Sequence, residues 1–204
     1  MTTINSLPCI KLSKDFVLAG VFALPFTEFK KDWYGKVPQA RTSFLFGTDE
    51  ENLFFALKCE KPASFDKQHK PGEYTENLWQ YDVAELFIVE PGSGRYQEFN
   101  LSPAGSWWSM LFSDYRLRDL EHFTMPAGLQ STGSVSEHLW QAALRVPLQS
   151  LSLSRKALKE YRLNICSIIN GTEKQYLSYA DAKSEKPDFH KTEYYLPWEP
   201  TLWK

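Results

Sequence analysis

The chain has 204 residues, and 43% of them are hydrophobic while 24% are charged. This length can bury one large core without dividing, so we expect a single domain over residues 1–204. The 23 lysines and arginines nearly balance 25 aspartates and glutamates, and no block of like charge occurs. The charge pattern therefore argues against nucleic acid or an anionic membrane surface as a partner, and no apolar run is long enough to predict a membrane-spanning helix.

The three cysteines are far apart and show no CxxC spacing: Cys9, Cys59 and Cys166. This pattern argues against a disulfide framework or a zinc site and favours reduced, packed thiols. No export signal is visible at the start of the sequence, so we expect a cytoplasmic protein, or a secreted or periplasmic one if a signal was removed.

Short runs of alternating apolar and polar residues follow one another along the chain, separated by Gly, Pro, Asn and Asp. This pattern is typical of an all-β antiparallel sandwich with few short helices. The predicted strands, in chain order, are Phe16–Ala23, Thr42–Phe46, Leu53–Cys59, Val83–Val89, Tyr96–Leu101, Trp107–Phe112, His138–Val146, Arg162–Ile169 and Gln175–Tyr179.

Turn chemistry separates several of these strands. The stretches 47–52 and 91–94 predict hairpins, and Asn170-Gly171 predicts a third turn. Helical signal is limited to Ser154–Glu160 and to one turn at Pro147–Leu151. The segments Lys61–Asn77 and Leu117–Val135 have no clear period, and we predict long loops there.

Splitting the strands by face separates an apolar side from a side that carries polar residues. The apolar sides include Ala84, Leu86 and Ile88 on one strand and Phe99 and Leu101 on the next. The opposite sides carry few lysines and many planar donors and acceptors, namely Glu85, Glu98, Asn100, Gln141, Arg145, Arg162 and Asn164. Such a face is either the ordinary solvated side of a sandwich or a site for a neutral polyhydroxylated ligand.

The sequence from Leu78 to Phe87, LWQYDVAELF, resembles the W-x-x-D-x-V-E-[IL]-F strand of family 9 carbohydrate-binding modules. The run from Tyr96 to Gly105, YQEFNLSPAG, resembles a segment common in the wider group of DOMON-type modules. Together with shorter matches further on, the resemblance extends from about Arg41 to Pro197. It implies a β-sandwich that binds a small saccharide or sugar end group on a concave sheet face, without catalysis.

The resemblance also implies roles for single residues. Trp79 matches the first of two tryptophans that sandwich the sugar, and Glu85 matches the family's glutamate. The second tryptophan is replaced here by Tyr179, and the position of Asn100 is an arginine in some members. The predicted ligand-binding set is Trp79, Glu85, Glu98, Asn100, Arg162, Asn164 and Tyr179. No cofactor is expected, although calcium occurs in members of the family.

Each of these residues also has a structural interpretation. Trp79 could close the core at the start of a strand, and Glu85 could form an ion pair with Arg145 or Arg162. The adjacent Trp107 and Trp108 must point to opposite faces of their strand, which predicts that one belongs to the core.

Three other functions remain open from the sequence. Glu85 and Glu98 share a face and could act as the acid and base of a glycosidase. Because some DOMON-type modules bind haem through Met and His, a haem site is the second alternative, with Met110, Met125, His122 and His138 as available ligands. A protein-interaction module that uses exposed aromatic residues is a further possibility.

Overall fold

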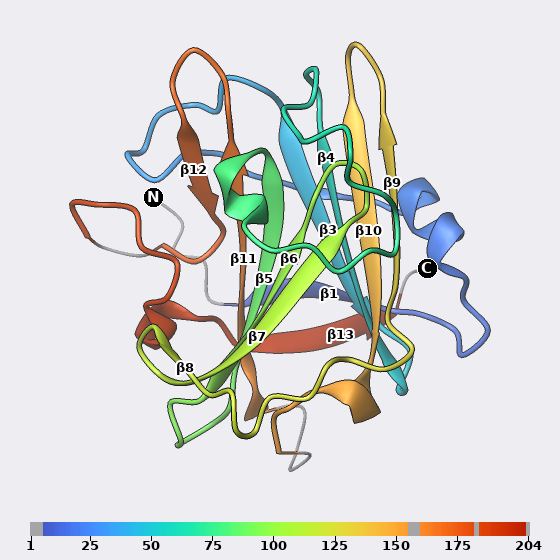
Figure 1. The fold of residues 1–204 in the computed structure, drawn as a ribbon, viewed down its shortest axis with the longest axis vertical. Coiled ribbons are helices and arrows are strands. Elements are labelled where there is room, and N and C mark those ends of the chain that lie inside the picture. The colour runs from blue at the N-terminus through green and yellow to red at the C-terminus, as the bar shows by residue number, and fades with distance from the viewer. Residues whose placement is uncertain (1–5, 155–159, 182–183, 203–204) are drawn as a thin grey trace.

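The structure is a computed structural model, and it describes residues 6–154, 160–181 and 184–202. Two β-sheets pack face to face (Figure 1). The first sheet has seven strands in the order β13-β1-β3-β4-β10-β9, with β2 also paired to β3. Their bounds are β1 Leu7–Lys11, β2 Thr27–Glu28, β3 Thr42–Thr48, β4 Asn52–Cys59, β9 Gln130–Val135, β10 Trp140–Pro147 and β13 Trp198–Leu202.

The second sheet has six strands in the order β12-β11-β5-β6-β7-β8. Every pairing in this sheet is antiparallel, whereas β1 in the first sheet runs parallel to both β3 and β13. The predicted sandwich is confirmed, with β1 as its parallel exception. The bounds are β5 Val83–Val89, β6 Tyr96–Leu101, β7 Trp107–Asp114, β8 Leu117–Arg118, β11 Arg162–Ile169 and β12 Gln175–Ser178.

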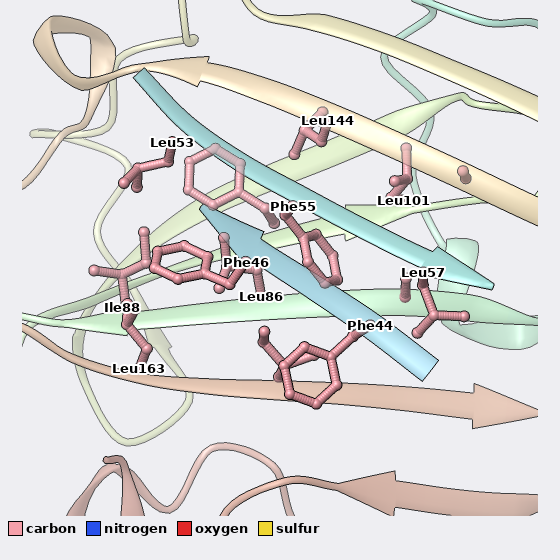
Figure 2. Close-up of a cluster of buried hydrophobic side chains, with 14 of the residues drawn as sticks. Phe44, Phe46, Leu53, Phe55, Leu57, Leu86, Ile88, Leu101, Leu144 and Leu163 are labelled. Atoms are coloured by element: carbon pink, nitrogen blue, oxygen red, sulfur yellow. The ribbon is translucent and has the colours of Figure 1, made fainter. Parts of the chain in front are cut away.

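The main core lies between the two sheets. Figure 2 shows Phe44, Phe46 and Phe55 from the first sheet gathered with Leu86 and Ile88 from β5, and all five are almost completely buried. Burial of large apolar side chains is the dominant stabilising term in such a sandwich. The predicted apolar faces of β5 and β6 are confirmed as the sides that pack in this core.

The second sheet also packs side chains on its outer face, which a purely solvated face would not do. Val83 and Phe87 of β5 contact a cluster with Trp108, Phe189 and Tyr195, in which the last two residues come from the C-terminal segment. Trp107 lies in the main core while Trp108 lies in this outer cluster, which confirms their predicted separation. The outer face is therefore covered in part.

One predicted strand is wrong. Residues 18–23 form the 3-10 helix η1 (Leu18–Ala23) instead of continuing a strand from Phe16. Val21 inserts between Leu45, Ala56 and Ala143 on the outer face of the first sheet. The apolar residues thus cap an exposed sheet face, and a periodic pattern cannot distinguish that role from a strand.

Five strands were not predicted, namely β1, β2, β8, β9 and β13. β9 lies within the predicted loop Leu117–Val135, and its sequence QSTGSV has no apolar alternation. It lies at the edge of its sheet, where backbone pairing with β10 replaces side-chain burial. β13 contains Pro200 and pairs with β1, as an edge strand can.

The predicted turns are confirmed between β3 and β4, between β5 and β6, and between β11 and β12. The turn predicted at Pro147–Leu151 is the 3-10 helix η3 (Leu148–Ser150), whereas the helix predicted at Ser154–Glu160 falls largely on 155–159, outside the described residues. Two further 3-10 helices are η2 (Leu78–Gln80) and η5 (Thr192–Tyr194). In the described part of the chain, no helix has the length and hydropathy needed to traverse a bilayer.

Candidate functional site

A cavity of about 410 Å³ opens on the outer face of the second sheet. Small-molecule sites usually have volumes of roughly 300–1,000 Å³. Its floor is formed by side chains of β5, β6, β7 and β11. Its walls are η2 with the residues before it, β8 with the preceding turn, β12, and the segment 187–190. Figure 1 shows this C-terminal segment beside β8.

The aromatic side of the cavity combines an exposed ring with a buried one. Trp79 lies on η2 and is 51% exposed, whereas Trp108 lies on β7 and is only 6% exposed. Tyr176 of β12 and Phe189 add two more rings to the lining. An exposed tryptophan at the entrance of a cavity gives an apolar ligand face a surface to stack on.

The η2 helix that carries Trp79 is anchored through the completely buried Asp82. The Asp82 carboxylate accepts hydrogen bonds from the backbone N–H groups of Ser64 and Asn170, and Lys61 Nζ lies 2.6 Å from its Oδ2. Three segments are thereby joined at the start of β5, which positions Trp79 beside the floor of the cavity.

Two carboxyl groups occupy the floor. Glu85 on β5 is 3% exposed and Glu98 on β6 is 6% exposed, and both line the cavity. Since Glu85 pairs with Asn100 and Phe87 with Glu98, the two glutamates are diagonal neighbours on one face of the sheet. Burial, and then the charge of Glu98, raise the pKa of Glu85 well above its usual range. Burial also raises the pKa of Glu98 to about 7, although Asn100, Arg116 and Arg118 favour its charged form.

Two arginines face these carboxyls from the β7–β8 region. Arg116 Nη2 donates to Asp188 Oδ1 at 3.0 Å, so that this arginine is already paired with a carboxylate. The guanidinium carbon of Arg118 lies 5.4 Å from the ring centroid of Trp108, within cation–π range. Both arginines line the cavity and can donate hydrogen bonds to a ligand.

His190 closes the remaining side. The hydroxyl of Tyr96 accepts a hydrogen bond from the backbone N–H of Arg116 at 3.0 Å and lies 2.8 Å from His190 Nδ1. The hydroxyl hydrogen is therefore free to be donated to Nδ1, which leaves the imidazole proton on Nε2, 4.0 Å from Glu98 Oε2. Burial, followed by the charge of Arg116, lowers the pKa of His190 to about 4.

The structure brings three of the predicted site residues together at the cavity, namely Trp79, Glu85 and Glu98. Asn100 belongs to the same sheet face, opposite Glu85 in the register, but it is buried beneath the lining rather than part of it. The face alternation of β5 and β6 was sufficient to group Glu85, Glu98 and Asn100, whereas Trp79 was placed by the family resemblance.

The other three predicted residues do not reach the cavity. Asn164 donates to Ser178 Oγ and accepts from the Ala180 N–H, so its side chain joins β11 to the end of β12. Arg162 is exposed at the far end of β11, opposite Val89.

Tyr179 packs instead against Phe44 in the main core, with ring centroids 4.9 Å apart. Successive residues of β12 alternate between faces, so Tyr176 points to the cavity and Tyr179 has the opposite parity. The predicted partner arginines of Glu85 are also wrong. Arg145 belongs to the first sheet, where it donates to Gln130, and among the described residues no ion pair joins Glu85 to either arginine.

Sequence reasoning missed Trp108, Arg116, Arg118, Tyr176 and His190. For Trp108 the signal was present, because it shares the face of Asn100 in the next strand. Arg116 and Arg118 had no such signal, since β8 is too short to show a period. Only the packing of the C-terminal segment brings His190 to the wall of the cavity.

The haem ligands considered from the sequence do not line the cavity. Met110 is buried in the outer cluster, whereas Met125, His122 and His138 are exposed. Within the described ranges, no group of three or more His, Cys, Asp or Glu side chains could hold a metal ion. The three cysteines are buried, and none of them forms a disulfide within the described residues.

Comparisons by sequence found no matching family model and no matching curated protein. Solved structures are nevertheless similar. A candidate carbohydrate-binding protein from Bacteroides uniformis superposes with a TM-score of 0.73 at 16% identity, covering 96% of this chain and 99% of its own. A family 9 carbohydrate-binding module from Caldicellulosiruptor kristjanssonii in complex with glucose gives a TM-score of 0.57 at 8% identity, over 95% of each chain.

The chain has the fold of a family 9 carbohydrate-binding module. A second structure of such a module from the same organism, in complex with cellotriose, agrees with a TM-score of 0.56 at 8% identity, over 96% of this chain and 95% of that one. The resemblance of the β5 motif to family 9 modules is thus confirmed at the level of the fold. The resemblance to DOMON-type modules stays a prediction, and the comparisons assign no residue of the family 9 fold to a site in this chain.

Proposed function

We propose that the chain binds a small saccharide or the end group of a longer one in this cavity, without transforming it. The observation that carries the proposal is the half-exposed Trp79 beside a floor that holds two buried carboxyl groups. A sugar ring needs an apolar surface for its C–H face and directional polar groups for its hydroxyls. This cavity combines both.

The polar groups match the inventory of sugar hydroxyls. Glu98 can accept hydrogen bonds from hydroxyls, and Arg116 and Arg118 can donate to their oxygens. Bonds in which one partner is charged are the stronger ones, so a few of them can orient a neutral ligand. The similarity to modules that were solved with glucose and cellotriose supports the choice of these two sugars as first probes.

Titration calorimetry with glucose and cellotriose tests the proposal. We expect Trp79→Ala to weaken binding by about ten-fold or more, equivalent to roughly 1.4 kcal/mol. The matched control is Tyr34→Ala, which removes an aromatic side chain of similar exposure, 58% against 51%, that does not line the cavity. Equal weakening by both variants, or no binding of either sugar or of any glycan on an array, would contradict the proposal.

Glycoside hydrolysis is the second candidate, because a carboxyl with a pKa of about 7 suits a general acid. In glycosidases, however, the two carboxyls flank the scissile bond. Glu85 and Glu98 instead approach a ligand from the same sheet face. We therefore expect no release of reducing sugar from cellotriose. If the wild type does release reducing sugar and Glu98→Gln does not, the function is catalysis rather than binding.

A further inference from the structure

Asn100 connects the two glutamates of the cavity floor. It lies directly opposite Glu85 across the β5–β6 pairing and two residues from Glu98 on the same face of β6. Its amide donates to the Glu98 carboxyl, whereas its Oδ1 is buried and has no hydrogen-bond partner among the described residues. A buried acceptor without a donor is costly, which calls for a donor at this point.

Two cross-strand neighbours of Asn100 carry groups that can donate: Trp108 on β7, through its indole N–H, and Glu85 on β5, when its carboxyl is protonated. We consider Glu85, because its protonation changes the charge of the site. An ionised carboxylate only accepts hydrogen bonds, whereas a protonated carboxyl has one O–H to give. An amide placed between two carboxyls offers N–H to one and oxygen to the other. A proton on one of the two carboxyls lets the amide bond to both of them, whichever way the amide is oriented.

The surrounding charges decide which carboxyl is protonated. Glu98 faces His190 Nε2 at 4.0 Å, and both Arg116 and Arg118 favour its ionised form. Glu85 faces Glu98, the Cys166 thiol of β11 and the Tyr195 phenol, and the charge of Arg116 lowers its pKa less than burial raises it. In the described part of the chain, Glu85 takes part in no ion pair. The cations thus favour a charge on Glu98 more than a charge on Glu85.

We infer that Glu85 is a neutral carboxylic acid that donates its proton to Asn100, while Glu98 is the ionisable acceptor that makes ligand binding depend on pH. The pH dependence of binding through Glu98 rests on the proposed function, whereas the protonation of Glu85 does not. The site then presents a carboxylic acid beside a carboxylate, which suits vicinal hydroxyls and disfavours ligands that carry a carboxylate of their own.

The pH window follows from Glu98. Its carboxyl loses its proton near pH 7, whereas His190, with a pKa of about 4, stays neutral there and both arginines stay charged. Charge-assisted hydrogen bonds are about twice as strong as neutral ones. Affinity for an uncharged sugar should therefore rise by about five- to ten-fold between roughly pH 5.5 and 8.5.

Carboxyl carbon NMR of the ligand-free protein tests the protonation directly. We expect one glutamate resonance that is still protonated at neutral pH and is missing in Glu85→Gln, and another that titrates near pH 7 and is missing in Glu98→Gln. Glu137→Gln, at an exposed position in the β9–β10 turn, should leave both resonances in place. Wild-type spectra with every glutamate ionised at pH 6, or an exchange of the two assignments, would overturn the inference.

Calorimetry with glucose and cellotriose at both ends of the pH range tests the consequence. Glu85→Gln leaves Glu98 in place and should keep the rise of affinity with pH, measured as the ratio of its own affinities at the two pH values. Glu98→Gln should lose the pH dependence. A wild-type affinity that is constant with pH would refute the role of Glu98 in pH-dependent binding. If neither sugar binds at any pH, the proposed function fails, and the spectra alone decide whether Glu85 is protonated.

Discussion

At the scale of single residues, His190 links the cavity to the stability of the fold. Its ring lies 5.4 Å from the rings of both Phe87 and Phe112 and 5.8 Å from that of Tyr96, so that it is enclosed by aromatic groups. A charged imidazole would lose hydration there and would be repelled by the charge of Arg116. This burial keeps the ring neutral and available as a hydrogen-bonding group.

The depressed pKa of His190, about 4 instead of 6.5, makes stability depend on pH. Below pH 6.5 the unfolded chain binds a proton that the folded chain does not, so stability is lost as the pH falls toward 4. The free energy of unfolding of the wild type should therefore fall by an amount on the order of 2–3 kcal/mol between roughly pH 7 and 4 because of His190. His190→Gln should not show this part of the decrease, and urea unfolding at each pH measures it.

The matched control for this experiment is His138→Gln, which changes an exposed histidine and should reproduce the wild-type profile. The raised pKa of Glu98 acts in the opposite direction, because stability from its neutral form is lost as the pH rises toward 7. The profile of each variant is therefore compared with wild type at the same pH. Identical slopes for His190→Gln and wild type would contradict a buried, neutral His190.

At the scale of elements, the turn between β6 and β7 packs against β9 of the opposite sheet with no room for side chains. Gly105 has a φ of +86°, and a Cβ on it would lie 2.6 Å from Gly133 N. A Cβ on Gly133 would lie 2.3 Å from Pro103 O. Ser131 Oγ donates to Gly105 O at 2.6 Å, which ties the two elements together. This contact joins the second sheet, at its β6–β7 turn, to β9 of the first sheet.

We expect Gly133→Ala to destabilise the protein by about 3 kcal/mol or more, because the atoms it meets belong to the backbone and cannot rotate away. Gly72→Ala is the control: a Cβ there meets nothing within 4 Å, and only the positive φ of 81° penalises it, by about 1 kcal/mol. Denaturant midpoints of the two variants measure the difference. A Gly133 variant as stable as the Gly72 variant would argue against this close approach.

At the scale of the whole molecule, the cavity and the core lie on opposite faces of the same sheet. Leu86 and Ile88 of β5 point to the core, while Glu85 and Phe87 point to the outer face. A defect in the core between the sheets should therefore lower stability without changing the cavity. The alternation of side chains along β5 separates the two roles.

Phe55→Ala tests this separation, because Phe55 is 1% exposed and lies in the core of Figure 2. We expect a loss of about 3–5 kcal/mol and a melting temperature lower by about 10 °C. Sugar affinity measured well below the melting temperature should remain within about two-fold of wild type. Val17→Ala, at a side chain that is 67% exposed, is the control for stability. A large loss of affinity in Phe55→Ala would show that the core and cavity are coupled.

Much of the second sheet could be predicted from the sequence, because its central strands are regular and bury one full apolar face. The bounds of β5, β6 and β11 agree with the prediction residue by residue. The edge strands β8 and β9 could not be predicted in this way. Their residues are mostly exposed, so the energy that orders them comes from backbone pairing with a neighbour.

The residues of the candidate site also fall into two groups, those that the sequence predicts and those that only the tertiary structure places. By itself the sequence determined that Glu85 and Glu98 share a face and that Trp79 precedes β5, since these are local consequences of a two-residue period. Tertiary structure alone decided that Arg116, Arg118 and His190 complete the cavity and that Tyr179 belongs to the core. Their positions depend on contacts between residues far apart in the chain, and no local pattern encodes such contacts.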